Sequence, residues 1–191
     1  IMSVDEMACG LLGEERTPEK ATAIARHIKR EILSTVGDQL KCSIGVGPNV
    51  MLAKVAGDMQ KPAGLTLIDD GDLPEKLYRL KITDFPGIGP RMEKRFHRYG
   101  VGTTQQLVRL TVRQLSDVWG SRVHGERWFH LLRGEDVPTK ETKRRTLGHS
   151  HVLPPELRTD AGAYGVLARL VHKAAARLRT VDYWTGAMAV D

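Results

Sequence analysis

The stretch SIGVGPNVMLAKVAGDMQKPAGL, residues 43–65, decides how this chain folds. Its alternating apolar residues up to Val46 predict a half-buried strand, and the pattern after it predicts a short helix from about Val50 to Met59. The apolar side chains of that helix share one face, and Lys54 falls on another face, from which it can project. A lysine in such a place is usually solvated, but it can also supply a point charge for a phosphate.

The residues before this stretch extend the pattern to a β-α-β unit. Residues 1–9 look like a strand, and an amphipathic helix is expected over residues 18–36, with Thr17 as its N-cap and Gly37 as its stop. A proline, a glycine and an acidic turn mark a boundary near residues 62–72. Because a strand begins at once, with no leader, we expect the sequence to be part of a longer protein.

The acidic turn contains Asp69, Asp70 and Asp72, and such a group of carboxylates suggests a calcium loop. A calcium loop of that kind has a glutamate at its twelfth position, which this sequence does not supply. An ordinary turn is therefore the better interpretation.

The remainder of the chain is expected to be helical up to residue 136 and to combine strands with a helix after that. Residues 73–136 contain only short helical patterns, separated by small polar or glycine connections. A basic linker is expected at 137–146, a strand at 146–153, an amphipathic helix at 164–181 and a last strand at 184–190. The predicted fold class is α+β.

The composition limits the class of protein. The chain has 191 residues, of which 41% are hydrophobic, and it has no long apolar run that could span a membrane. A net charge of +6 and a pI of about 9.5 favour a polyanionic partner, whereas 5% aromatic residues argue against a protein that stacks many bases. Without a secretion signal, Cys9 and Cys42 are interpreted as two reduced core thiols of a cytoplasmic protein.

The segment DFPGIGPRMEKRFHRYGV, residues 84–101, carries the most specific local pattern. Pro-Gly-Ile-Gly between two short helices predicts a hairpin whose glycines let a phosphate approach the backbone at the start of the second helix. This pattern resembles the helix–hairpin–helix motif, which holds a nucleic-acid backbone without reading its sequence. The alternative is an ordinary tight turn. The predicted contacts to the nucleic-acid backbone are Gly87, Ile88, Gly89, Arg91 and Lys94.

Two weaker patterns extend the expected nucleic-acid surface. In WGSRVHGERW, Gly120 and Gly125 bracket a loop before another helix, and a second phosphate contact and a plain turn are equally compatible with it. The basic run KETKRR, which ends in Arg144 and Arg145, is either a solvated linker or a continuation of the same backbone contact.

Two pairs of side chains raise the question of a metal. His149 and His151 alternate on the expected strand, but no third or fourth zinc ligand is in view, so no zinc site is expected there. Asp5 and Glu6, in SVDE, are strand neighbours that point to opposite faces unless a bulge or a twisted strand end brings them together. On pattern alone they indicate a surface strand end.

SVDE, SIGVGPNVMLAKVAGDMQKPAGL, DFPGIG and RRTLGH follow one another along almost the whole chain. In this order and spacing they resemble the Y-family (translesion, DinB/UmuC-like) DNA polymerases. The family pattern has a Ser-hydrophobic-Asp-Glu strand in the palm, then Ser-Ile-Gly, Asn, Ala-Lys and Lys-Pro-x-Gly. A thumb with a helix–hairpin–helix motif follows, and then a little finger that opens near Ser/Thr-hydrophobic-Gly.

The resemblance implies a partial palm at 1–66, a helical thumb at 67–136, a basic linker at 137–146 and a partial little-finger domain at 147–191. It implies a DNA-directed DNA polymerase that adds nucleotides across damaged template with two Mg²⁺ ions. Its implied partners are primer–template DNA and deoxynucleoside triphosphates, with room for a sliding clamp bound through segments outside these residues.

The resemblance also assigns roles to single residues. Asp5 resembles a metal-binding aspartate, and Glu6 resembles the adjacent catalytic carboxylate, so both are expected at the metal. Lys54 resembles the palm lysine that meets the nucleotide triphosphate. The positions that match the family's DNA-tracking linker and first little-finger strand are Arg144, Arg145 and Thr146.

Two departures from the family limit these expectations. A further metal-binding aspartate and the fingers would precede residue 1, so residues 1–191 alone are expected not to polymerise. Ala8 and Gly10 stand in a stretch that is aromatic-Leu-Asp in the family, which indicates a divergent subfamily. Two other functions stay open: a non-catalytic helix–hairpin–helix protein, with salt-sensitive DNA binding, and a module whose basic faces bind an acidic protein.

Overall fold

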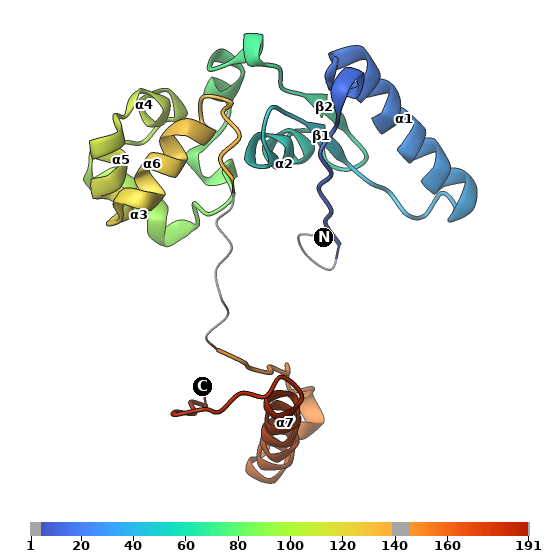
Figure 1. Ribbon diagram of the computed structural model, residues 1–191, viewed down its shortest axis with the longest axis vertical. Helices are drawn as coiled ribbons and strands as arrows, with labels where there is room; N and C mark the ends of the chain where they lie inside the picture. The colour runs from blue at the N-terminus through green and yellow to red at the C-terminus, as the bar shows by residue number, and fades with distance from the viewer. Residues whose placement is uncertain (1–4, 139–145, 191) are drawn as a thin grey trace. The chain divides into compact units, whose positions relative to one another are not determined.

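The computed structural model describes residues 5–138 and 146–190. The chain divides into two compact units, 1–138 and 139–191. The helices and strands of the first unit are α1 (Pro18–Thr35), β1 (Ile44–Val46), α2 (Val50–Met59), β2 (Leu65–Leu67), α3 (Pro90–Arg98), α4 (Thr104–Arg109), α5 (Val112–Trp119) and α6 (Arg122–Leu131). The second unit contains α7 (Asp160–Thr180). In Figure 1 the first unit shows α1, α2 and the strands in one lobe and α3–α6 in the other.

The sheet of the first unit is a short parallel pair, β1 and β2, with α2 as the connection between them. Ile44 pairs with Leu65, and Val46 pairs with Leu67. The prediction of a strand over residues 1–9 is wrong for its described part, because residues 5–9 join neither strand of this sheet. A strand is held by its neighbour's hydrogen bonds, and apolar alternation alone does not supply them.

Glycines in the opening stretch let α2 lie directly against β1. A Cβ atom on Gly45 would lie 1.9 Å from the carbonyl oxygen of Ala53 and 2.2 Å from the backbone nitrogen of Gly57. Since real Cβ atoms do not approach backbone so closely, only glycine fits at position 45 with the helix in this place. The contact fixes the position of α2 on the strand.

The first helix, α1, forms as its sequence predicts. Thr17 caps it by accepting a hydrogen bond from the backbone of Lys20, and Gly37 follows its end with a φ of +109°. From the middle of α1, Lys29 donates hydrogen bonds to the carbonyl oxygens of Cys42, Ala63 and Gly64, at 2.7, 2.6 and 3.2 Å. One ammonium group therefore ties α1 to the segments that lead into both strands.

The region after β2 is helical, as predicted for residues 73–136, but its first part forms 3-10 turns in place of an α-helix. The 3-10 turns in the described part of the chain are η1 (Gly13–Arg16), η2 (Asp70–Asp72), η3 (Glu75–Arg79), η4 (Ile82–Asp84) and η5 (Pro155–Leu157). One hydrophobic core runs from Leu52 and Val55 of α2 through Phe85 to Phe96 of α3 and Trp128 of α6. The sheet region and the α3–α6 region are thus packed together.

Asn49 joins these two regions by hydrogen bonds. Its side-chain oxygen caps α2 by accepting from the backbone N–H of Leu52 at 2.9 Å. Its amide nitrogen donates to the carbonyl oxygens of Leu131 at 2.9 Å and Glu135 at 3.1 Å, at the end of α6. Asn49 is buried, so these carbonyl groups depend on it for their partner.

The second unit consists of η5, α7 and extended chain. Thr159 caps α7, and Val166 is its buried residue, whereas Tyr164 is exposed. The predictions of strands over 146–153 and 184–190 are wrong, because no strand is assigned there. The amphipathic helix predicted at 164–181 is confirmed.

Two further findings concern the whole described chain. The prediction of core thiols is wrong, since Cys9 is exposed and Cys42 is only half-buried, although both are free. Within residues 5–138 and 146–190, no helix combines the length and the apolarity that a bilayer crossing requires.

Asn49 gives a test of this packing. Asn49→Ala is expected to lower the free energy of unfolding by about 2–4 kcal/mol, because a helix cap is removed and two buried carbonyl groups lose their donor. Asn49→Asp is the matched control, since it keeps the cap oxygen but cannot donate. It is expected to lose most of the same free energy in urea denaturation. An aspartate variant as stable as wild type would show that the cap alone matters.

Candidate functional site

Two residues that the sequence marks as functional, Glu6 and Lys54, meet in the structure. Lys54 projects from α2, whose Val55 and Ala56 are buried, and its ammonium pairs with Oε1 of Glu6. The Lys54 side chain is 28% exposed and that of Glu6 is 39% exposed. This partial shielding from water strengthens the attraction relative to a fully solvated pair.

A second ion pair lies at the end of α2, beside the first. Nζ of Lys61 is 2.5 Å from Oδ1 of Asp58. The pKa of the Lys61 ammonium is raised by its hydrogen bond to Asp58 and that residue's charge, and further by the charges of Glu6 and Asp5. Three carboxylates and two ammonium groups therefore gather around the end of α2. No role was predicted for Asp58 or Lys61 from the sequence, although their i, i+3 spacing at a helix end predicts a contact.

The charged groups of this site are chemically suited to a hard cation and a phosphate. Asp5 and Glu6 offer carboxylate oxygens, and Lys54 offers a point charge. In the described part of the chain, no three His, Cys, Asp or Glu side chains form a group that could hold a metal ion. A metal here would need ligands beyond these side chains.

The predicted hairpin is present between η4 and α3. Gly87 has a φ of +96°, a conformation that favours glycine, and the N–H of Ile88 closes the turn by donating to the carbonyl oxygen of Phe85 at 3.0 Å. Phe85 and Ile88 are buried, so they anchor the turn and leave Gly87 and Gly89 exposed.

The exposed side of the hairpin leads into a basic helix. Gly89 is the N-cap of α3, and a Cβ atom there would meet nothing within 4 Å. The first-turn N–H groups of a helix have no partner inside it, and Arg91 and Lys94 are exposed close by. This arrangement suits an approaching phosphate.

An aromatic cluster packs around the buried residues of the hairpin. Trp119 and Trp128 stack with ring centroids 5.0 Å apart, Phe85 packs on Trp128, and Phe96 packs edge-on against Trp119. These side chains come from η4–α3, α5 and α6, so the hairpin is held on a rigid base.

The second, weaker glycine pattern is confirmed only in its first half. Gly120 ends α5 with a φ of +64°, as a turn residue. Gly125 lies inside α6, where a Cβ atom would come within 2.3 Å of the backbone nitrogen of Ser116. Its placement in a loop is therefore wrong, and its small size serves the close packing of α5 on α6.

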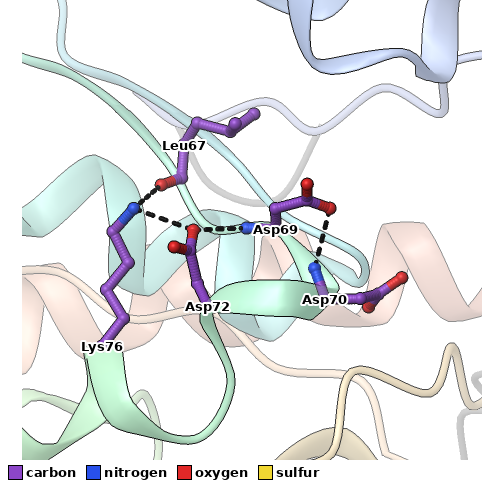
Figure 2. Close-up of polar contacts among 5 residues, drawn as sticks. All are labelled: Leu67, Asp69, Asp70, Asp72 and Lys76. Atoms are coloured by element: carbon purple, nitrogen blue, oxygen red, sulfur yellow. Dashed lines mark hydrogen bonds and ion pairs between the residues drawn. The ribbon is translucent and has the colours of Figure 1, made fainter.

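The acidic turn is closed by its own hydrogen bonds. Figure 2 shows Oδ2 of Asp72 accepting from the backbone N–H of Asp69 and from Nζ of Lys76, each at 2.9 Å. Nζ of Lys76 also donates to the carbonyl oxygen of Leu67 at 2.6 Å, and the N–H of Asp70 donates to Oδ1 of Asp69 at 2.8 Å. The Lys76 ammonium thus pairs with one of the turn's three carboxylates, and the turn's own backbone groups engage the side chains of Asp69 and Asp72, in agreement with the interpretation as an ordinary turn.

The remaining site residues lie near or beyond the start of the second unit. Arg144 and Arg145 are outside the described residues. Thr146, His149 and His151 are exposed in extended chain.

Comparison with known proteins matches two segments of this chain, one that contains Glu6 and Lys54 and one that contains the hairpin. Residues 1–58 match the model of the impB/mucB/samB family, and residues 70–101 match the IMS family HHH motif. DNA polymerase IV of Moorella thermoacetica is 32% identical over 99% of this chain and 47% of its own length.

Together these matches support a Y-family, DinB-like DNA polymerase fragment.

Solved Y-family structures show the same fold. A Y-family DNA polymerase chimera of Dbh and Dpo4 matches with a TM-score of 0.57 and 27% identity, over 70% of this chain and 38% of that chain. An insertion ternary complex of Dbh DNA polymerase matches with a TM-score of 0.54 and 26% identity, over 66% of this chain and 36% of that chain. The chain thus spans about half of the M. thermoacetica relative and about a third of these structures.

The two family matches cover both charged features of this chain. Asp5, Glu6, Lys54 and Asp58 fall within the first match, and the hairpin falls within the second. Lys61 lies between the two matched segments.

The acidic turn gives a pH test. The pKa of Asp72 is lowered by the N–H of Asp69 and then by Lys76, so this carboxylate stabilises the fold above its unfolded pKa, and the stabilisation disappears as the pH falls through the lower, folded value. Asp72→Asn is expected to cost about 0.5–1 kcal/mol at pH 7, and this cost is expected to shrink as the pH falls below the unfolded pKa of 3.8 towards the lower folded value. Urea denaturation across this range measures it.

Lys76→Met is the control for the cause of this effect. It removes the ammonium but keeps the larger contribution, the Asp69 N–H, so part of the pH dependence is expected to persist. A cost of Asp72→Asn that does not change with pH would contradict the role given to the carboxylate charge.

Proposed function

We propose that this chain supplies part of the nucleotidyl-transfer site and the DNA grip of a translesion DNA polymerase. The contact of Glu6 with Lys54 carries the proposal, because it brings together a carboxylate and an ammonium that lie 48 residues apart. Both residues fall within the matched impB/mucB/samB segment. The chain spans about half the length of the M. thermoacetica relative, so the activity belongs to a whole polymerase that includes such a segment.

The division into polymerase domains is part of the same proposal. Residues 1–66 correspond to a partial palm and 67–136 to a thumb, and the two are joined by the shared core and by Asn49. Residues 137–146 correspond to a linker and 147–191 to part of a little finger. The helical content of 73–136 and the match to the HHH motif support the thumb.

Asp5 and Glu6, beside α2, supply two of the oxygen ligands that a Mg²⁺ ion would need, and its other ligands would come from outside the described side chains. Mg²⁺ in proteins is usually held by one or two carboxylates together with substrate phosphates and waters, and Asp5 and Glu6 supply such carboxylates. Mg²⁺ bound there would neutralise charge and activate the attacking oxygen in nucleotidyl transfer.

The protein groups of the site then take complementary roles. Asp5 and Glu6 would hold the cation next to the primer end. Lys54 and Lys61 attract the triphosphate, since ammonium groups near its oxygens stabilise the charge that develops during transfer. The hairpin at Gly87–Gly89 and the cations of α3 hold the DNA backbone, which keeps the primer end in position.

Primer extension tests the catalytic part. In the longest natural polypeptide that contains this sequence, the double variant Asp5→Asn/Glu6→Gln is expected to extend a primer on the order of 10³-fold more slowly, because cation binding is worth several kcal/mol. Asp69→Asn, which alters an exposed carboxylate on the acidic turn, is the matched control and is expected to retain activity. If the parent polypeptide binds primer–template but never extends it, the chain is a non-catalytic DNA-binding protein.

DNA binding by residues 1–191 tests the hairpin. Arg91→Gln/Lys94→Gln is expected to weaken duplex binding and to lower the slope of log K against log salt by about 2, because each of the two removed cations neutralises one phosphate. Arg26→Gln/Arg30→Gln on α1 makes the same charge change away from the hairpin. Fluorescence anisotropy at several salt concentrations compares them, and equal decreases in affinity would indicate a diffuse basic surface.

A glycine variant tests whether DNA binding depends on the open backbone of the hairpin as well as on the nearby positive charges. Gly89→Ala puts a methyl group into open space, so the fold is expected to persist while the approach of a phosphate is blocked. Unchanged DNA affinity of this variant would contradict backbone contact at the hairpin.

A further inference from the structure

A cleft with a volume of about 280 Å³ lies in the first unit, between the segment that joins η2 to η3 and the ends of α4 and α6. Four apolar side chains and two charged ones line it: Asp70, Leu73, Pro74, Val108, Leu132 and Arg133. The apolar residues are buried or half-buried, whereas Asp70 and Arg133 are exposed. The cleft thus has an apolar interior and one charge of each sign at its rim.

The guanidinium of Arg133 is held in place by the fold. Its Cζ lies 3.5 Å from the centroid of the Phe129 ring, and its Nη1 and Nη2 donate to the carbonyl oxygens of Phe129 at 2.8 Å and Val108 at 3.1 Å. Burial against these groups lowers the pKa of Arg133, and the charge of Glu135 offsets this only in part. Since a guanidinium has five N–H donors, it can bind an anion and keep both of these hydrogen bonds.

The two charged residues of the cleft do not satisfy each other. Among the described residues, no ion pair joins Arg133 to a carboxylate, and the carboxylate of Asp70 accepts no hydrogen bond. Figure 2 shows this carboxylate pointing away from Lys76, whose ammonium engages Asp72. Opposite charges at one cleft, each without an ion-pair partner, favour a ligand that carries both charges.

The cleft is small, and Gly134 helps to enclose it. Gly134 has a φ of +86°, and a Cβ atom there would lie 2.8 Å from Oδ1 of Asp70 and 3.1 Å from Cδ1 of Leu73. The chain after α6 therefore lies close to the turn that carries Asp70. Because liquid water occupies about 30 Å³ per molecule, a space of about 280 Å³ has room for roughly nine non-hydrogen atoms, the size of a free leucine.

We propose that this cleft binds a free apolar α-amino acid, with its carboxylate on Arg133, its ammonium on Asp70 and its side chain in the apolar interior. The cleft shares no residue with the charged cluster on α2 or with the hairpin, so the proposal goes beyond the proposed function. Its walls come from the segment after β2 and from α4 and α6, and Asn49 holds the end of α6 beside it. A bound amino acid would therefore stabilise the contact between these parts of the first unit.

A titration of ¹⁵N-labelled residues 1–191 with L-leucine tests the site, because the backbone amides of residues 132–134 report binding there by their chemical shifts. We expect a dissociation constant on the order of 1 mM, since so small a ligand makes few contacts. Leucinamide lacks the carboxylate and N-acetyl-leucine lacks the ammonium, and each is expected to bind about fivefold more weakly. Glycine keeps both charges but has no side chain to bury, so its affinity is expected to be about tenfold lower.

Variants assign the two charges. Asp70→Asn is expected to weaken leucine binding about fivefold and to leave the affinity for N-acetyl-leucine unchanged, because that ligand has no ammonium. Asp69→Asn, which alters a neighbouring carboxylate that does not line the cleft, is the matched control. Arg133→Gln is likewise expected to weaken leucine about fivefold and to leave leucinamide unchanged, with Arg109→Gln as its control. The amide spectrum of each variant away from the cleft checks the fold, and the ligand series tests the same charges without a substitution.

Three results would overturn the proposal. They are no shift at residues 132–134 at about twentyfold the expected dissociation constant, equal affinities for leucine and glycine, and equal affinities for leucine and N-acetyl-leucine. The last result would assign the cleft to a carboxylate alone, such as the C-terminal residue of a peptide. None of these readouts involves primer extension, so failure of this site and failure of the proposed function are distinguishable.

Discussion

The arrangement of the first unit depends on the hydrogen bonds of the Asn49 side chain. Its oxygen caps the start of α2, and its nitrogen donates to the carbonyl groups of Leu131 and Glu135 at the end of α6. One amide therefore joins a helix of the proposed palm to the last helix of the proposed thumb. A buried amide with both ends engaged cannot be replaced by an apolar group without leaving backbone groups unpaired. The charged site on α2 and the hairpin before α3 therefore belong to one rigid framework.

Sequence patterns predicted most of the helices and the strand that ends at Val46, but they failed for the expected strands near the two ends of the sequence. Caps and apolar spacing are local, so the residues of α1 and α2 contain the information for their own bounds. Residues 5–9 and 146–153 alternate like strands but are not strands, because a strand depends on a neighbour that local sequence does not specify. The 3-10 turn at η3 (Glu75–Arg79) differs from the expected helix for a related reason, since packing overrides propensity in short segments.

The candidate site was predictable in its components and not in its contacts. The resemblance to a family marked Glu6 and Lys54, but their ion pair spans 48 residues and depends on the fold. Asp58 lacked any such mark, and Lys61 was marked only as part of the Lys-Pro-x-Gly turn without a role of its own, until the structure placed both near Glu6. The hairpin was the most predictable part, because its glycines and the apolar residues that anchor it are neighbours in the sequence.

The close approach of Gly45 to Ala53 and Gly57 has a consequence for how fast the Lys54 ammonium can move. With backbone against backbone, α2 has no room to slide or rotate on β1. Any relocation of the Lys54 ammonium must then come from torsions within its own side chain, which occur within picoseconds to nanoseconds. A rearrangement confined to one side chain needs no domain movement, so it would be far faster than lid or hinge motions on the microsecond-to-millisecond timescale.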